Sequence, residues 1–128
     1  MIVLDTHAWL WHIAAPERLS AKVRAAIDAG EDLGICTISC WEVAMLERGG
    51  RIALDRPVRE WVGRALAHER LEAIPLSSEI ALDAALVPDL FPGDPADRII
   101  YATARRLQAR LATKDAPLRR FDRHTTFW

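Results

Sequence analysis

The sequence predicts an α/β protein built on a mostly parallel sheet of four or five strands, with helices on both faces. Short apolar runs at residues 2–4, 33–38, 71–74 and 111–113 are typical of strands that are buried on both sides. Helical patterns separate these runs, and an alternation of strands and helices favours right-handed crossovers and parallel pairing. A chain of 128 residues is long enough for one core and too short for two. We therefore expect a single domain over residues 1–128.

The first half of the chain predicts two strands and four helices. Residues 2–4 and 33–38 form the strands, and each helix starts after a side chain that can accept hydrogen bonds from free backbone amides. Ser39 and Glu42 fit a capping box, in which a serine and a glutamate three residues later each bond to the other's amide. The four predicted caps are Asp5 or Thr6, Ser20, Ser39 and Asp55.

The second half continues the alternation. The run at 71–74 is a short strand, and a helix opening at Ser77 or Ser78 extends to Leu86. The longest predicted helix covers residues 95–108, because Asp94 is a suitable cap and a proline fits the first helical position. Residues 111–113 then form a strand, and residues 125–128 an edge strand. No repeat or linker interrupts this order.

Composition limits the function classes. Apolar residues make up 51% of the chain and charged residues 27%, which is typical of a globular protein. No run approaches the roughly 20 apolar residues of a membrane span, and residues 1–4 lack a basic leader, so we expect a cytoplasmic protein without membrane contact. Cys36 and Cys40 have no second pair with which to form a zinc site, and we expect reduced thiols.

The basic residues are unevenly distributed although the net charge is only −1. Seven of the seventeen lysines and arginines lie between residues 105 and 123. The overall charge argues against nucleic-acid binding by bulk electrostatics. Two interpretations of the basic segment remain open: a solvated helix face followed by a polar loop, or a rim that contacts phosphates.

Four acidic residues are predicted at one edge of the sheet. In parallel α/β sheets ligands bind where the strands end, and the acids that belong to this edge are Asp5, Glu42, Asp97 and Asp115. Each alone is explained by helix capping or by a turn. Together they would repel one another unless they bind protons or a cation. Oxygen ligands suit Mg²⁺ or Mn²⁺ better than zinc, and such a site can hydrolyse phosphodiesters through a metal-activated water.

Four phrases of the sequence resemble the signature blocks of PIN domains, and more narrowly of VapC toxins from type II toxin–antitoxin pairs. The phrases are Leu4–Trp11, Ser39–Glu42, Gly93–Ala104 and Leu111–Asp115. The resemblance implies a PIN-like three-layer fold and a Mg²⁺- or Mn²⁺-dependent endoribonuclease. It also implies a cognate antitoxin partner, an RNA substrate and a homodimer.

Position by position, the resemblance places the catalytic and metal-binding acids at Asp5, Glu42, Asp97 and Asp115. It implies that Thr113 holds a neighbouring acid or a metal-bound water, and Thr6 is given a similar role. We interpret Asp94 as the helix cap in a supporting position. The side chains of Arg98 and Lys114 either contact a phosphate or pair with the adjacent acids. The first helix, with Trp9, Leu10, Trp11 and Ile13, is the predicted surface for a protein contact.

Two alternatives stay open at this point. One is another metal-dependent phosphoryl hydrolase, such as a small phosphatase or a DNA-directed nuclease. The other is a non-catalytic binding module whose acids only cap helices.

Overall fold

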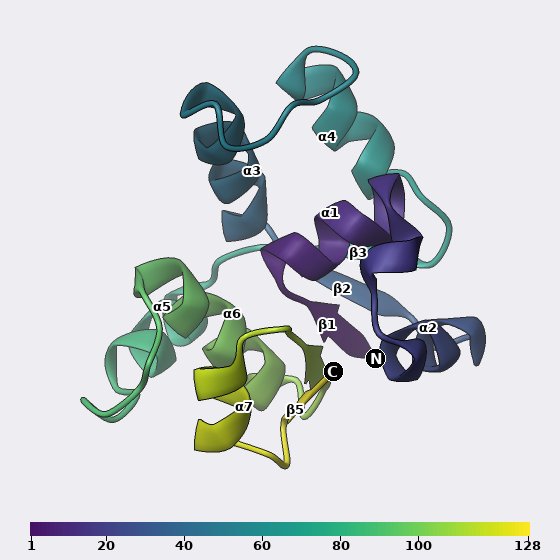
Figure 1. Ribbon diagram of the computed structural model, residues 1–128. Helices are drawn as coiled ribbons and strands as arrows, with labels where there is room; N and C mark the ends of the chain where they lie inside the picture. The colour runs from purple at the N-terminus through teal and green to yellow at the C-terminus, as the bar shows by residue number, and fades with distance from the viewer.

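A five-stranded parallel sheet forms the centre of the protein, in the order β3-β2-β1-β4-β5, and the prediction of the fold class is confirmed. The computed structural model describes all 128 residues (Figure 1). The strands are β1 (Ile2–Leu4), β2 (Leu33–Cys36), β3 (Leu71–Ile74), β4 (Arg110–Ala112) and β5 (Thr126–Phe127). Because β1 is central, the residue that follows it lies in the middle of the carboxyl edge.

Helices cover both faces of the sheet. Ile2 and Leu4 pack with residues of α1, α2, α3 and α4, whereas Val3, between them, packs with residues of α5, α6 and α7. This alternation is the side-chain period of a strand buried on both sides. The helices are α1 (Thr6–Ala14), α2 (Ala21–Asp28), α3 (Ile38–Arg48), α4 (Val58–Leu66), α5 (Ser78–Ala85), α6 (Pro95–Arg106) and α7 (Ala116–Phe121), with a short 3₁₀ turn at Pro16–Arg18.

Several boundaries differ from the sequence prediction. Strand β2 ends at Cys36 because α3 already begins at Ile38. The prediction that Asp55 caps the fourth helix was wrong: α4 starts at Val58 without a side-chain cap, and Asp55 pairs with Arg56 at 3.0 Å. The predicted caps Asp5, Ser20, Ser77 and Asp94 all accept the expected amide hydrogen bonds.

Helix α7 was not predicted. Asp115 accepts a hydrogen bond from the Leu118 amide, and Pro117 occupies the first turn. The signal was present, since an acid followed closely by a proline also starts α6. The local role expected for Asp115 was that of a turn former, but this residue caps α7, and Arg119 and Arg120 therefore lie on a helix.

The turn after α7 is fixed by Asp122. Burial acts to raise the pKa of this carboxyl, but hydrogen bonds from the Thr125 and His124 amides and from the Tyr101 hydroxyl lower the pKa to about 2. The Tyr101 bond measures 2.8 Å and links the turn to α6. These bonds hold β5 against β4.

No helix is both long and apolar enough to pass through a lipid bilayer.

Candidate active site

Asp5 and Asp115 lie at the carboxyl ends of two neighbouring strands. Asp5 follows β1 and caps α1, because its Oδ1 accepts from the Ala8 amide at 2.7 Å. Asp115 caps α7 in the same way at the end of β4. Thr113 connects the two acids: its Oγ1 accepts from the Asp115 amide at 3.1 Å, and its hydroxyl acts to lower the pKa of Asp5 against the larger effect of burial. Thr113 is buried, so it holds both acids in fixed positions.

Glu42 is held by Thr6 and not by a capping box. The Thr6 hydroxyl donates to Glu42 Oε1 at 2.5 Å, and its oxygen lies 2.9 Å from Ser39 Oγ. The capping-box prediction for Ser39 was wrong because α3 begins at Ile38, two residues earlier than a helix capped by Ser39 would, which places Ser39 inside the first turn and fully buried. A buried hydroxyl needs a partner, and Thr6 supplies it. Sequence reasoning assigned Thr6 a supporting role but missed Ser39.

Asp94 and Asp97 form a reciprocal capping box at the start of α6. Asp94 Oδ1 accepts from the Asp97 amide at 2.9 Å, and Asp97 Oδ2 accepts from the Asp94 amide at 3.2 Å. Gly93 is required beside them, since a Cβ at this position would lie 2.5 Å from Asp97 Cβ and from Phe91 Cε1. The expectation that Asp94 is the cap is confirmed, while Asp97 contributes its side chain to both the cap and the acidic edge.

The acids influence one another electrostatically. Burial, followed by the charge of Asp94, raises the pKa of Asp97 to about 7. Burial also raises the pKa of Glu42, to which the charges of Asp94 and Asp5 add. Burial raises the pKa of Asp5 too, with a smaller effect from Asp115. Glu42 therefore interacts electrostatically with both pairs of acids, through Asp5 of the Asp5–Asp115 pair and through Asp94 of the Asp94–Asp97 pair.

The donor set fits a hard cation although the acids do not yet enclose one. No three acidic, histidine or cysteine side chains stand close enough together to hold a metal ion. The four acids also have no ion pair, since the six salt bridges involve other residues. Carboxylate and hydroxyl oxygens are the ligands that Mg²⁺ and Mn²⁺ accept, and a divalent ion would relieve the repulsion that adds to the effect of burial on these pKa values.

Neither basic neighbour pairs with the acids, so that part of the prediction was wrong. The Arg98 guanidinium donates to the carbonyl oxygens of Ala84 and Val87, at 3.2 and 3.4 Å, and lies over the Phe91 ring. The Lys114 ammonium lies 5.4 Å from the centre of the Trp11 ring. Arg98 therefore stabilises the loop before α6, and Lys114 keeps an unneutralised charge next to Asp115.

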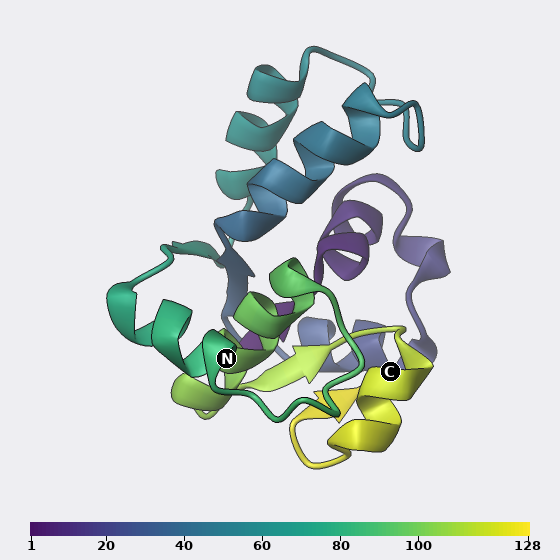
Figure 2. The same cartoon turned by 90° about the vertical axis from the view of Figure 1, so that its left-hand side faces the viewer.

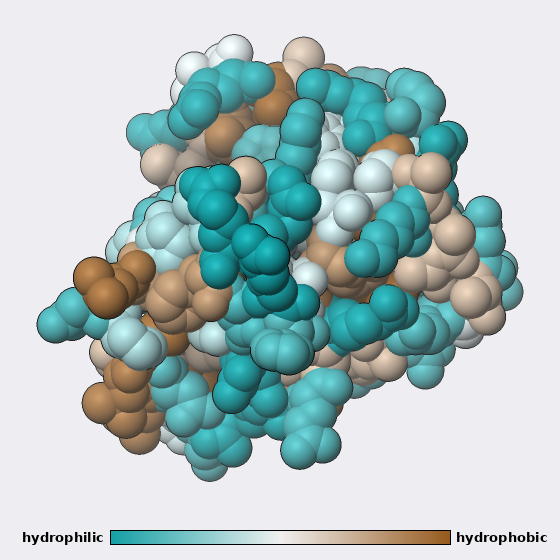
Figure 3. All heavy atoms as spheres, turned by 60° about the horizontal axis from the view of Figure 1, so that its bottom comes forward, coloured by the Kyte–Doolittle hydropathy of each residue, from teal (hydrophilic) through white to brown (hydrophobic).

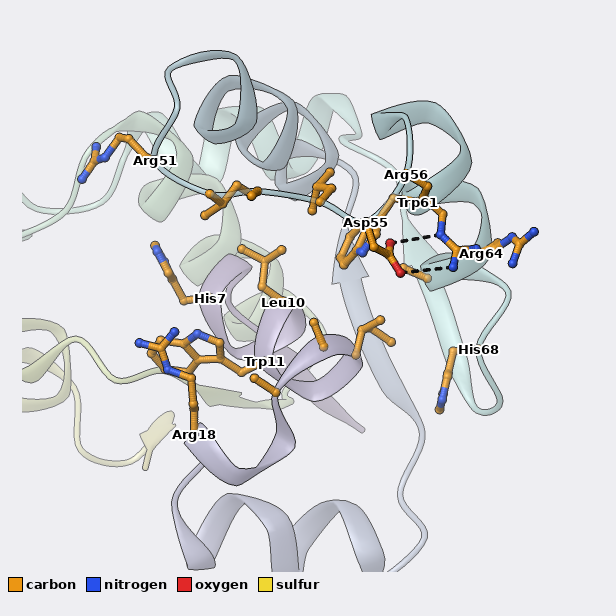
Figure 4. A pocket seen from close by; sticks show the side chains of 17 residues that line it. His7, Leu10, Trp11, Arg18, Arg51, Asp55, Arg56, Trp61, Arg64 and His68 are labelled. Carbon is orange, nitrogen blue, oxygen red and sulfur yellow. Dashed lines mark hydrogen bonds and ion pairs between the residues drawn. The ribbon is translucent and has the colours of Figure 1, made fainter.

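A cavity of about 980 Å³ lies beside this edge, and none of the four acids lines it. Figure 2 shows α3 and α4 extending away from the sheet, and the cavity lies between α1, the 51–56 segment and α4. Figure 4 shows His7, Trp11 and Arg18 on one side of it, opposite Arg56, Trp61 and Arg64. His7, which lines the cavity, follows Asp5 by two residues. The cavity therefore lies next to the acids but is not formed by them.

The first helix offers less apolar surface than expected. Trp9 is fully buried and packs edge-on against Trp61, with ring centres 5.5 Å apart, and Leu10 is buried as well. Trp11 and Ile13 are only half-buried and remain accessible. The prediction that Trp9 contributes to a protein contact was therefore wrong, because this side chain fills the core beneath α4.

Comparisons with known proteins define the family. Residues 2–124 match the PIN domain family. The chain is also 40% identical to Ribonuclease VapC22 of Mycobacterium tuberculosis over 129 aligned residues, which cover 99% of this chain and 98% of the relative. The chain belongs to the VapC family of PIN-domain proteins. The resemblance of the four sequence phrases is thus confirmed over nearly the whole length.

Three solved structures share the fold at low sequence identity. A toxin–antitoxin complex from Klebsiella pneumoniae aligns with a TM-score of 0.71 and 17% identity, covering 100% of this chain and 97% of the other. FitAcB from Neisseria gonorrhoeae gives a TM-score of 0.67 and 21% identity with the same coverage. VapBC2 from Rickettsia felis, bound to a promoter DNA fragment, gives 0.63 and 16%, covering 99% and 98%. The PIN-like three-layer architecture is therefore confirmed.

Proposed function

We propose that the protein is a metal-dependent endoribonuclease and the toxin of a type II toxin–antitoxin pair, with a single domain over residues 1–128. The observation that carries the proposal is the set of four acids without cationic partners: Asp5 and Asp115 at the carboxyl ends of β1 and β4, and Glu42 and Asp97 on α3 and α6. The 40% identity to a protein named a ribonuclease supports RNA as the substrate. Half-buried, mutually repelling carboxylates are costly in a domain that only needs helix caps.

In this proposal Asp5, Glu42, Asp97 and Asp115 hold Mg²⁺ or Mn²⁺. A bound divalent ion would lower the pKa of a water molecule and offset negative charge on the leaving oxygen of the phosphodiester. The supporting residues orient these acids: Thr6 fixes Glu42, and Thr113 fixes both Asp5 and Asp115. Such supporting hydrogen bonds are typically needed to keep ligands in a productive orientation.

Protonation of Asp97 would weaken metal binding at the site. With a pKa of about 7 in the absence of a cation, this carboxyl is half protonated near neutral pH. A cation favours the ionised form, so metal affinity should rise with pH across this range.

The direct test is cleavage of a fluorescent single-stranded RNA with Mg²⁺, with and without EDTA, by the wild type and by Asp5→Asn. We expect cleavage only by the wild type with free Mg²⁺. Asparagine remains a good helix cap, so the variant should keep α1 intact. Equal cleavage in all four samples would identify a contaminating nuclease and contradict the proposal.

The cavity beside α1 is the proposed contact for the antitoxin. Its lining is mainly apolar, and Arg18 and Arg51 on its rim have no ion pair. An antitoxin segment with apolar and acidic side chains would be complementary. Ala14 is exposed on the cavity wall, so Ala14→Trp should fill the space and weaken antitoxin binding while RNA cleavage persists. Isothermal titration with the purified antitoxin measures this, and unchanged affinity would contradict the assignment.

Helix α5 and the segment after it are the proposed homodimer surface, in place of α1. Leu82, Leu86 and Leu90 expose 64%, 80% and 87% of their surface, and Figure 3 shows hydrophobic residues gathered on the side where α5 lies. Exposed apolar patches commonly mark protein contacts. Leu86→Ser should therefore shift the mass measured by light scattering toward a monomer at low micromolar concentration. Leu107→Ser is the control, and a monomeric wild type would refute the dimer.

A further inference from the structure

A second, smaller pocket of about 360 Å³ lies between α2, α7 and β5. It is lined by four basic residues and by Trp128 among others, and no acidic side chain contributes to it. The four basic residues are Lys22, Arg119, Arg120 and Arg123. Figure 3, in which the lower side of Figure 1 comes forward, shows hydrophilic residues gathered across the middle of this face. The pocket therefore concentrates positive charge in a protein whose net charge is −1.

None of these four cations has an acidic partner. The six ion pairs of the protein involve other residues, and the nearest acid in sequence, Asp122, is occupied by Tyr101 and Arg105. In addition, Arg119 Nε is buried without any hydrogen-bond partner. Buried donors in native proteins nearly always have a partner, so an orphaned guanidinium nitrogen in a basic pocket points to an absent anion.

Aromatic rings extend the pocket toward the acidic edge. Trp128 lines the pocket and packs edge-on against Trp11, with ring centres 5.8 Å apart. The Trp11 ring carries two further unpaired cations, Arg18 at 4.7 Å and Lys114 at 5.4 Å. Lys114 precedes Asp115 in sequence, and Ala116, directly after it, lines the pocket. A strip of cations and indole rings thus joins the pocket to the proposed cleavage site.

We propose that this pocket binds a backbone phosphate of the RNA substrate, and that the strand runs from it past Trp128 and Trp11 to the acids. The inference rests on the proposed function. Phosphate oxygens would pair with the unneutralised guanidinium groups, and bases would lie against the exposed edges of the two indoles. A volume of about 360 Å³ is near the lower end of small-ligand pockets and is sufficient for one phosphate with its ribose.

RNA suits the pocket better than the antitoxin does. The pocket adjoins Asp115, whereas the large apolar cavity lies between α1 and α4. A backbone phosphate needs cations and few apolar contacts, which is the composition of the smaller pocket. Because the protein as a whole is slightly acidic, a local basic site must supply the electrostatic attraction for RNA.

The test compares two triple variants in the Asp5→Asn background, where RNA remains intact. The pocket variant carries Lys22→Gln, Arg120→Gln and Arg123→Gln. The control carries Arg24→Gln, Arg48→Gln and Arg59→Gln, which remove the same charge from exposed, unpaired arginines elsewhere. All six side chains are exposed, so both variants should fold, and circular dichroism melting checks this. A third variant, Lys22→Arg with Arg120→Lys and Arg123→Lys, keeps the charge.

Binding of labelled single-stranded RNA is measured by fluorescence anisotropy between about 50 and 200 mM salt. We expect the pocket variant to lose about 10-fold or more in affinity and its salt slope to become shallower by up to about 2, since each single-strand phosphate contact contributes about 0.7. The control should change much less, and the charge-preserving variant should remain close to the parent.

Two outcomes would overturn the inference. One is an equal loss of affinity and slope in the pocket and control variants, which would indicate bulk charge. The other is a pocket variant that binds RNA normally but loses antitoxin affinity, which would assign the pocket to the protein partner. Cleavage by the wild-type chain is measured separately, so failure of the proposed nuclease activity and failure of the pocket give different results.

Discussion

The acidic edge and the basic pocket lie close together and carry unpaired charges of opposite sign. At the edge, Asp5, Glu42 and Asp97 have raised pKa values and no cationic partner. In the pocket, four cations have no acid, and one guanidinium nitrogen has no hydrogen bond. Half-buried acids without a counter-charge, and a cluster of cations that contains one buried, unsatisfied nitrogen, are both unfavourable without a ligand, which supports the proposal that each site binds one.

A paired charge gives the contrasting case. Asp122 accepts hydrogen bonds from Tyr101, Thr125 and His124 and pairs with Arg105 at 3.3 Å. Its pKa is lowered to about 2, whereas that of Asp97 is raised to about 7. Two aspartates of one chain thus have pKa values shifted in opposite directions, which agrees with a structural role for Asp122 and with the ligand-binding role proposed for Asp97.

The largest effect should come from removing an acid at the edge. Asp97→Asn and Asp5→Asn should each lower Mg²⁺-dependent RNA cleavage by at least about 100-fold, because loss of a supporting partner alone typically costs about 10–100-fold. Asp89→Asn, an exposed acid without hydrogen bonds, is the control. If Asp94→Asn is inactive while Asp97→Asn cleaves normally, the assignment at α6 is wrong.

Removing the paired acid should instead affect stability. Asp122→Ala should lower the free energy of unfolding by about 2–3 kcal/mol, since hydrogen bonds to a charged group each contribute about 1.5–3 kcal/mol and are partly replaced by water. RNA cleavage by the folded variant should be near that of the wild type. Urea denaturation and initial cleavage rates measure the two quantities. A large loss of cleavage without loss of stability would remove the distinction between Asp122 and the acidic edge.

Thr6 tests how far the edge depends on its supporting hydroxyls. Thr6→Val keeps the shape of the side chain but removes the donor to Glu42 and the partner of buried Ser39. We expect Mg²⁺ affinity, measured as the concentration for half-maximal cleavage, to fall by about 10–100-fold. Thr6→Ser should restore most of it because it returns the hydroxyl. Equal behaviour of the valine and serine variants would show that packing, and not the hydrogen bond, is what matters.

The sequence was sufficient to predict the strands and the local helix caps, but not the side chains that pair across long distances in sequence. Buried apolar runs identified β1 to β4, and parallel topology then placed Asp5 and Asp115 at one edge. Helix caps that act locally, such as Ser20, Ser77 and Asp94, were also predictable, because their hydrogen bonds depend only on neighbouring amides.

Partners far apart in sequence were not predictable. Thr6 binds Ser39 and Glu42 across 33 and 36 residues, and no local pattern distinguishes this from a capping box. The basic pocket depends on α7, which was missed, and on Lys22 of α2, about 100 residues earlier than its neighbours. The packing of α2 against the C-terminal segment is a tertiary contact that the sequence does not reveal. The clustering of basic residues in the sequence was therefore compatible with two interpretations, of which a rim that contacts phosphates was one.

The opposite pKa shifts predict a pH dependence of stability. Between its unfolded pKa near 3.8 and its folded pKa of about 7, Asp97 retains a proton in the folded protein that the unfolded chain releases. Stability should therefore fall as pH rises through this window, with Asp5 and Glu42 acting in the same direction. We expect the melting temperature in EDTA to decrease between pH 5 and 8, and less so in Asp97→Asn. Mg²⁺ should raise it more at pH 8 than at pH 5, and an equal increase at both would contradict a shared acidic site.

The smallest effect separates the two acids of the α6 capping box. Asp94→Ala should lower the free energy of unfolding by about 1 kcal/mol, the usual contribution of a helix cap, whereas Asp94→Asn should be nearly neutral because asparagine accepts the same amide hydrogen bond. Urea denaturation of the two variants measures this difference. Asp94→Asn also removes a charge that raises the pKa of Asp97, so its stability in EDTA should decline less steeply above pH 5. If Asp94→Asn keeps the helix cap and the cleavage rate but its stability depends less on pH, then Asp94 acts on the acidic edge through its charge and is not a catalytic residue.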